Sequence, residues 1–245
     1  MVTSELSPSS WAIEARGLGK SFGFRHALRD VNLRVRKGAR LAVFGPNGAG
    51  KTTLIKIFST ISKPSRGTVI IDGMDAGQTP EKIRARLGVV SHSTFLYNNL
   101  TVSENLRFYG KMFGVPDLEN RIKGVVEQVQ LSPRLHDRVG TLSHGMQRRV
   151  SIARAVLHDP SVLLLDEPES GLDPRATEMM SEILEAINSE ERTVLITTHN
   201  LERGLELCDE VVILHEGRIT YQSPREEINE ADFCQTYNRC TGLSG

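Results

Sequence analysis

A glycine-rich segment carries the clearest chemical signal in this chain; it reads Gly45-Pro-Asn-Gly-Ala-Gly-Lys51-Thr52 and joins a buried apolar run to a helical pattern. Glycines let successive backbone N–H groups curl around phosphate oxygens, and the N-terminus of the following helix adds its positive dipole end. The Lys51 ammonium group would reach the β and γ phosphates, and the Thr52 hydroxyl would ligate Mg²⁺. Chance alone would produce such a segment in about one chain of this length in a hundred. The segment therefore predicts a nucleoside triphosphate site.

Two adjacent carboxylates form a second chemical element. Asp166 and Glu167 follow Val162–Leu165, an apolar run typical of a strand buried on both faces. Ligands of α/β folds bind in the crevice at the carboxyl ends of such strands. Asp166 would support Mg²⁺ from its outer coordination sphere, and Glu167 would polarise a water for attack on the γ-phosphate. A solvated carboxylate pair would be the better interpretation if the pair stood alone, but beside a phosphate loop we favour catalysis.

The elements that must position these residues alternate between strand and helix patterns, which predicts an α/β domain with a largely parallel sheet. The chain is mainly helical in pattern from about 80 to 158, and Thr101 and Glu104 have the spacing of a capping box that opens a helix to about Phe113. We therefore expect a helical subdomain, about 92–158, inserted into the α/β core. Further strands are expected at 31–35, 41–44, 68–71, 193–196 and 211–214.

Composition bounds the class of protein. The chain has 245 residues, 39% hydrophobic and 24% charged, which is ordinary for a globular protein. The 30 basic residues balance the 30 acidic ones, which argues against nucleic-acid binding as the main function. Three cysteines without metal-ligand spacing indicate free thiols in a reducing compartment, and no apolar run approaches the ~20 residues of a membrane span. We expect a cytosolic protein with a disordered lead at 1–10 and a loosely packed helix and tail at 223–245.

One further segment resembles a known signature. Leu142-Ser-His-Gly-Met-Gln147 is similar to the LSGGQ signature of ATP-binding cassette (ABC) ATPases, and it lies shortly before the acidic pair as in that family. In the same order, Ser170-Gly-Leu-Asp173 resembles the D-loop, and His199 falls at the switch histidine. Phe22 falls at the aromatic residue that stacks on adenine. The match covers about 11–222.

The resemblance implies one ABC ATPase domain: a P-loop NTPase core of the α/β class with a mainly parallel sheet, an antiparallel β subdomain and the inserted helical subdomain. It also implies ATP and Mg²⁺ as cofactors, ATP hydrolysis, and two copies packed head to tail. Each ATP would then lie between the phosphate loop of one chain and Ser143 and Gly145 of the other. The implied partners are a second ATPase subunit and membrane-spanning permease subunits at the cytosolic face of the cell membrane, with no nucleic acid expected.

The motifs and the resemblance together define three groups of predicted site residues. Those for catalysis are Glu167, His199 and His92; those for nucleotide are Phe22, Gly45, Pro46, Asn47, Gly48, Ala49, Gly50, Lys51, Thr52, Thr53, Ser143, Gly145 and Asp173; those for metal are Thr52, Asp166 and His92.

The chain departs from the family pattern at two places. His92 stands where the family has a glutamine that contacts Mg²⁺ and water. A neutral imidazole can accept from water or ligate a metal, although a merely tolerated loop substitution is the alternative. His144 and Met146 replace Gly and Gln within the signature, while the phosphate-contacting Ser143 and Gly145 remain. Retained hydrolysis is expected.

The cargo and coupling are less constrained. The segment around 87–110 resembles exporter ATPases, most of all the ATPase of the cytochrome c maturation haem exporter and its drug-efflux (ABC-2) relatives. A groove between His92 and Phe113 would receive a coupling helix of the permease. Phe95, Leu96 and Tyr97 are candidates for its apolar floor, although any of the three could equally be ordinary core. Two alternatives stay open. One is a soluble ABC ATPase not coupled to transport, and the other is a non-hydrolysing module that uses ATP only to dimerise.

Overall fold

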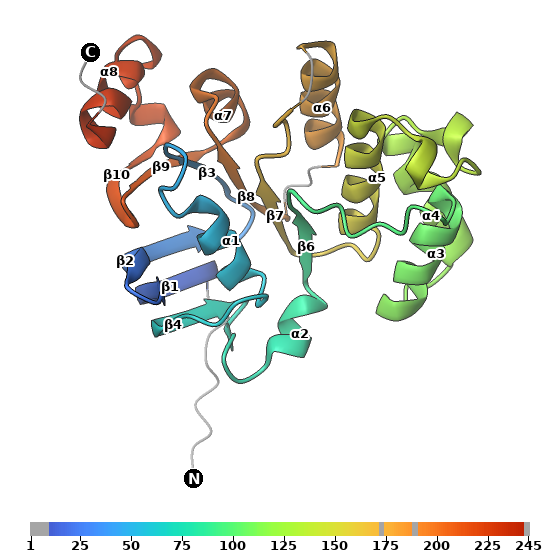
Figure 1. The fold of residues 1–245 in the computed structure, drawn as a ribbon, viewed down its shortest axis with the longest axis horizontal. Helices are drawn as coiled ribbons and strands as arrows, with labels where there is room; N and C mark the ends of the chain where they lie inside the picture. Colours follow the sequence, from blue (N-terminus) through green and yellow to red (C-terminus); the bar gives the residue numbers. More distant parts are fainter. Residues whose placement is uncertain (1–9, 172–173, 188–190, 243–245) are drawn as a thin grey trace.

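The computed structural model describes residues 10–171, 174–187 and 191–242. The N-terminal segment 1–10, expected to be disordered, lies outside these ranges except for Ser10, and Asp173 of the D-loop also lies outside them. Two sheets and a set of helices make up the fold (Figure 1). The α/β class with a P-loop core, a mainly parallel sheet, an antiparallel sheet and an inserted group of helices is confirmed.

The larger sheet has six strands, and all its neighbouring pairs are parallel except the one at the β10 edge. Successive residues of β3 face different cores: Leu41 and Val43 pack on one side, and Ala42 and Phe44 pack on the other. Burial on both faces explains why such strands read as continuous apolar runs. The strand order is β10 (Arg218–Pro224), β9 (Glu210–His215), β3 (Arg40–Phe44), β8 (Thr193–Thr198), β7 (Val162–Asp166) and β6 (Leu87–Val90).

The smaller sheet is antiparallel and covers one side of helix α1 (Lys51–Phe58). Leu54 and Phe58 of α1 belong to one buried cluster with Ile13 of the antiparallel sheet and Leu164 of the parallel sheet. Helix α1 is therefore wedged between the two sheets, which holds its N-terminus and the preceding loop in place (Figure 1). The strand order is β2 (Arg25–Arg36), β1 (Trp11–Phe22), β4 (Arg66–Ile71) and β5 (Met74–Asp75).

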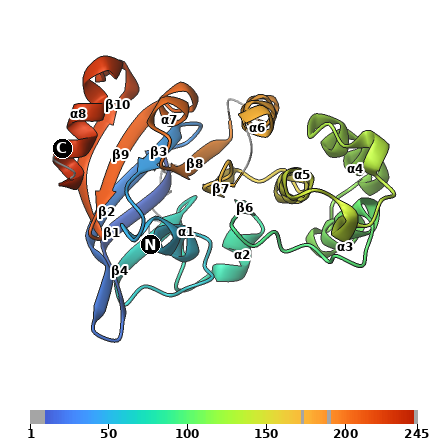
Figure 2. The same cartoon turned by 45° about the horizontal axis from the view of Figure 1, so that its top comes forward.

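The middle of the chain forms the predicted helices. Thr101 and Glu104 make the capping box: Thr101 Oγ1 accepts from the Glu104 N–H at 3.1 Å, and the Glu104 carboxylate accepts from the Thr101 N–H at 2.8 Å. Figure 1 and Figure 2 both place α3 and α4 at the opposite end of the molecule from the antiparallel sheet. The helices are α2 (Pro80–Arg84), α3 (Val102–Phe113), α4 (Leu118–Gln128) and α5 (His144–Val156).

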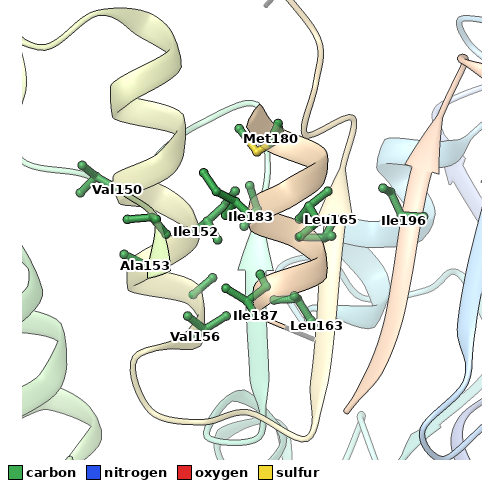
Figure 3. Close-up of a cluster of buried hydrophobic side chains, with 14 of the residues drawn as sticks. Val150, Ile152, Ala153, Val156, Leu163, Leu165, Met180, Ile183, Ile187 and Ile196 are labelled. Carbon is green, nitrogen blue, oxygen red and sulfur yellow. The ribbon is translucent and has the colours of Figure 1, made fainter. Parts of the chain in front are cut away.

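The last helices cover the face of the parallel sheet that α1 leaves open. Figure 3 shows Met180 and Ile183 of α6 (Pro174–Ala186) packed toward Leu165 of β7, with α5 alongside. Two further helices, α7 (Leu201–Leu207) and α8 (Glu230–Thr241), lie on the β9 side of α6. The C-terminal segment is packed more closely than its polar sequence indicated, because Phe233 of α8 is buried edge-on against Phe44 with ring centroids 5.5 Å apart. Within the described ranges, no helix combines the length and apolarity that crossing a membrane requires.

His158, just after α5, ties the helical region to the parallel sheet. Its ring stacks on Phe113 with centroids 4.0 Å apart, and its Nε2 lies 3.1 Å from the Leu87 carbonyl oxygen. Its Nδ1 is buried and has no hydrogen-bond partner among the described residues. Burial is the main cause that lowers the His158 pKa from 6.5 to about 4. The folded protein therefore holds this imidazole neutral.

This histidine should make stability pH-dependent. Between pH 6.5 and about 4 the unfolded chain takes up a proton at His158 that the folded chain does not, so the free energy of unfolding falls as pH falls through this window. His158→Gln should lower that slope by up to about 1.4 kcal/mol per pH unit. Denaturant titrations at several pH values measure the slope. His136→Gln, at an exposed position, should leave it unchanged, and equal slopes in the two variants would contradict the assignment.

Candidate active site

The glycine-rich loop connects the end of β3 to the start of α1. Gly48 and Gly50 adopt φ values of 83° and 114°, in the left-handed region that side chains disfavour. A Cβ on Gly50 would also lie 2.6 Å from the Ala27 carbonyl oxygen, which no real side chain tolerates. Only glycine allows this course of the backbone, and a loop of this shape can turn several of its amides toward an anion.

The loop borders a cavity of about 410 Å³, the size of a small-ligand pocket. Phe22, from the end of β1, and Glu167, from the end of β7, also line it, so the structure brings both predicted residues to the loop. The Phe22 side chain is 56% exposed, which leaves its ring accessible for stacking. The lining residues are Phe22, Arg25, Ala27, Pro46, Asn47, Gly48, Ala49, Gly50, Lys51, Thr52, Thr53 and Glu167.

Lys51 places a cation at the centre of the loop. Its Nζ donates to the Gly45 carbonyl at 2.6 Å and to the Pro46 carbonyl at 3.2 Å. The same Nζ lies 3.2 Å from Oε1 of Glu167, and the Lys51 side chain is only 5% exposed. Because charges interact more strongly where water is scarce, this ammonium group is positioned to attract an anion.

The acidic pair ends β7 beside the loop. Oδ1 of Asp166 accepts from Thr197 Oγ1 at 2.8 Å and from Thr52 Oγ1 at 3.3 Å. Glu167 has φ of +46°, a conformation that costs a non-glycine residue roughly 1–2 kcal/mol. Its N–H lies within hydrogen-bond distance of the carbonyl and the hydroxyl of Thr197, at 3.0 and 3.1 Å, which holds the turn. The turn directs the Glu167 carboxylate into the cavity.

Thr52 and Asp166 also suit a hard metal ion. A hydroxyl and a carboxylate oxygen 3.3 Å apart offer the oxygen ligands that Mg²⁺ prefers, usually completed by water and substrate phosphates. Among the described residues, no group of three or more His, Cys, Asp or Glu side chains could hold a metal ion. The residues present therefore fit an ion that arrives with a phosphate ligand rather than an all-protein site.

Of the remaining predicted residues that the structure describes, one lies near the Glu167 carboxylate and the others lie outside the cavity. His199, after β8, is near: its Nδ1 lies 3.6 Å from Oε2 of Glu167. His92 is exposed in the loop after β6 and is not among the residues that line the cavity. Ser143 caps helix α5, accepting from the Met146 N–H at 3.3 Å, and Gly145 lies in the first turn of that helix. Both views place β7 and β6 between α1 and α5, so the signature stands apart from the chain's own loop (Figure 1 and Figure 2).

Arg148 is a residue of the site that sequence reasoning missed. It is 3% exposed, and its guanidinium donates to the carbonyls of Asp166 at 3.1 Å, Glu167 at 2.7 Å and Pro168 at 3.1 Å. It also donates to the Ser91 carbonyl, next to His92. Burial lowers the Arg148 pKa. This side chain holds the backbone around Glu167 and joins it to the loop after β6. An arginine on the apolar face of a predicted helix is a signal for such a buried cation.

Two other residues of the site, Thr197 and Arg25, were harder to recognise from the sequence. Thr197 orients Asp166 and the Glu167 backbone, and Arg25 lines the cavity from β2. The sequence around Thr197 is an ordinary strand pattern, and Arg25 lies in a hairpin with no motif.

These features define a P-loop nucleoside triphosphatase. The family model described as "ABC transporter" matches residues 28–170, and the chain belongs to this ATP-binding cassette family. The "ABC transporter ATP-binding protein NatA" of Bacillus subtilis is 34% identical over 215 residues, covering 86% of this chain and 87% of the relative. A "Nod factor export ATP-binding protein I" of Ralstonia nicotianae is 36% identical over 225 residues, covering 91% and 70%. Proteins of this family bind ATP and hydrolyse it.

Solved structures agree with this assignment. One described as the ATP binding subunit of an ABC transporter has a TM-score of 0.80 and 30% identity, covering 92% of this chain and 94% of that one. The dimeric structure of a bacterial ABC transporter cassette has a TM-score of 0.81 and 26% identity, covering 88% and 100%. The expected ABC transporter ATPase is confirmed. A third relative, the "Linearmycin resistance ATP-binding protein LnrL" of Bacillus subtilis, is 33% identical over 209 residues, covering 84% of this chain and 67% of the relative. One of these three relatives is named for export, and none of the three names mentions haem.

Proposed function

We propose that this chain is the ATP-hydrolysing subunit of a membrane exporter, which works as a dimer at the cytosolic face of the membrane. The observation that carries the proposal is the cavity that unites Lys51 with Glu167 and lies beside the Thr52–Asp166 pair. A chain with no helix able to span a membrane among its described residues would need separate permease subunits for transport. The name of one relative, a Nod factor export ATP-binding protein, supports this coupling.

Each residue has a definite task in hydrolysis. Lys51 neutralises phosphate charge, and its neighbouring loop amides bind the phosphate oxygens. Thr52 and Asp166 would hold Mg²⁺, which would supply further charge neutralisation. Glu167 orients a water and accepts its proton, and His199, 3.6 Å from that carboxylate, stabilises its position. Phe22 offers a ring on which adenine stacks.

The signature serves the second copy of the chain. The N-terminus of α5, with Ser143 exposed and Gly145 beside it, is an anion-binding end that lies outside the chain's own cavity. A head-to-tail dimer would bring it to the γ-phosphate held by the partner's loop. The dimeric cassette among the structural relatives supports this arrangement, in which ATP joins the two subunits and hydrolysis releases them.

An exposed apolar patch, made of the aromatic residues Phe95, Tyr97 and Phe108 and of Met112, supports docking to a permease. These side chains are 45–58% exposed, and the Tyr97 and Phe108 rings meet edge-on with centroids 5.2 Å apart. Contiguous apolar surface of this kind marks a protein or membrane contact. The patch lies on α3 and on the loop that Arg148 ties to the Glu167 turn, so a docked helix would be coupled mechanically to the site.

The class of transported substrate is a further part of the proposal. Relatives named for Nod factor export and linearmycin resistance favour an efflux system of the drug-efflux type over a haem exporter of cytochrome c maturation. His92 also stays a proposal: from its exposed position it reaches metal or water only if the loop after β6 closes over the cavity. A soluble ATPase not coupled to transport and a non-hydrolysing module are the alternatives that the experiment must separate.

Co-purification from detergent-solubilised membranes with Mg-ATP tests the coupling. The full chain carrying Glu167→Gln should bring down a multi-span membrane protein, because blocked hydrolysis traps the closed dimer on its partner. Adding Tyr97→Ser and Phe108→Ser should remove that partner without removing the ATP-dependent dimer. Phe24→Ser, at a fully exposed aromatic residue outside the patch, should remove nothing. If only soluble proteins or nucleic acid co-purify, transport is the wrong assignment.

A further inference from the structure

A second cavity, of about 350 Å³, lies on the antiparallel β region and is close in size to the nucleotide cavity. It is built from the β1–β2 hairpin, the segment that enters β4, and the start of β10. It shares no lining residue with the nucleotide cavity, which the hairpin lines through Phe22, Arg25 and Ala27. Its lining residues are Gly19, Lys20, Ser21, His26, Leu28, Arg29, Ser65, Arg66 and Arg218.

The lining is strongly and locally basic. Of its nine residues, four carry a formal positive charge, namely Lys20, Arg29, Arg66 and Arg218, and a fifth is the imidazole of His26. The part of the chain that the structure describes contributes no acidic side chain to the lining. The chain as a whole has a formal net charge of zero, so this concentration does not follow from composition. None of the five takes part in an ion pair within residues 10–171, 174–187 and 191–242. Clustered like charges repel one another, and an anion placed among them relieves that repulsion.

Hydrogen bonds organise the polar groups of the wall. Ser21 Oγ lies 2.8 Å from His26 Nδ1, and the Ser21 N–H donates to Ser65 Oγ at 3.1 Å. Lys20 Nζ donates to the Lys63 carbonyl at 2.7 Å, which fixes its ammonium group at the rim. The buried Leu28 forms part of the floor. Two hydroxyls and an imidazole are therefore held among the cations rather than left free on the surface.

We propose that this cavity is a second anion site, separate from the nucleotide site, that binds a phosphate-bearing ligand. Guanidinium groups such as those of Arg66 and Arg218 pair bidentately with phosphate oxygens, and serine hydroxyls and imidazole N–H groups complete such a shell. The volume suits a phosphate or diphosphate group with a small organic part. The ligand is either a free phosphate compound or the headgroup of an anionic phospholipid, which share this chemistry.

Pyrophosphate binding tests the site. In a Lys51→Ala background, which weakens the nucleotide loop, isothermal titration should still detect one pyrophosphate, with affinity that falls as salt rises. Adding Arg66→Gln and Arg218→Gln should weaken that binding about tenfold or more. The matched pair Arg34→Gln and Arg36→Gln, on exposed positions of the same sheet outside the cavity, should leave it unchanged. No binding in the Lys51→Ala background, or equal affinity in both double variants, would overturn the proposal.

Vesicles separate the two sources of phosphate. The full chain and both double variants are sedimented with phosphatidylcholine vesicles that contain phosphatidic acid, and with phosphatidylcholine alone. Binding to the anionic vesicles that Arg66→Gln with Arg218→Gln abolishes assigns the site to a lipid headgroup. Pyrophosphate binding without vesicle binding assigns it to a free phosphate compound. Matching thermal unfolding curves for both double variants confirm that neither loss reflects misfolding.

Discussion

Replacing Glu167 with Gln is expected to slow ATP hydrolysis by about 10²–10⁴-fold while ATP binding is preserved. The glutamine side chain has the shape of glutamate but cannot accept a proton from water. The carboxylate sits between Lys51 Nζ at 3.2 Å and His199 Nδ1 at 3.6 Å, so its position is set by the first residue of α1 and by the segment that follows β8. Losing its charge removes the base and leaves the backbone contacts to Arg148 and Thr197 intact.

Phosphate release under saturating ATP measures this effect, and gel filtration with ATP reports whether the dimer accumulates. Glu127→Gln makes the same chemical change at an exposed position on α4 and should retain the full rate. Equal rates for wild type and Glu167→Gln would refute the assignment of Glu167 as the base. They would also revive the non-hydrolysing module as the better description.

Lys51→Ala is expected to weaken ATP binding by about 10²-fold or more and so to abolish hydrolysis at ordinary ATP concentrations. The variant removes the cation at the centre of the loop. It also leaves the Gly45 carbonyl without the donor that Lys51 supplies and the Glu167 carboxylate without its nearest positive charge, while the Pro46 carbonyl keeps only the Ala49 N–H at 3.1 Å. The loop would then present acceptor oxygens to an anion, which raises the cost of binding phosphate.

Fluorescent-nucleotide titration measures the affinity. Lys56→Ala provides the control, because Lys56 is exposed on the same helix, one turn further on, and carries the same charge. ATP affinity in Lys51→Ala equal to that of Lys56→Ala would exclude the proposed role of the loop lysine.

Local features of this protein were predictable because neighbouring residues decide them. The strand–loop–helix around Lys51 follows from an apolar run, three glycines and a helical repeat, and the capping box follows from the Thr101–Glu104 spacing. Strands β3, β7 and β9 bury both faces, which makes their apolar runs easy to recognise, whereas the edge strand β10 is mostly exposed or half-buried. The packing of the C-terminal helix was less predictable, because Phe233 contacts Phe44, which is distant in sequence, only in the folded chain.

The sequence predicts which residues form the site, but it does not predict how they are arranged in space. The residue types and motifs of Lys51, Asp166 and Glu167 were sufficient to name them, because phosphate binding and water activation each require a particular chemistry at a particular spacing. Their mutual distances were not available from spacing, since β3 and β7 contact each other only through β8, which lies later in the chain. Thr197 belongs to that intervening strand, and so its bonds to the acidic pair could not be foreseen.

The amino-acid sequence by itself determined the class of this protein: the phosphate loop, the acidic strand end and the signature occur in the order of an ABC ATPase. Only the tertiary structure decided that Arg148 binds the carbonyls around Glu167 and that five basic residues from separate elements surround one cavity. The physical reason is that motifs depend on local backbone geometry and residue chemistry. A buried cation or a charged cavity depends on which strands and hairpins the sheet order brings together.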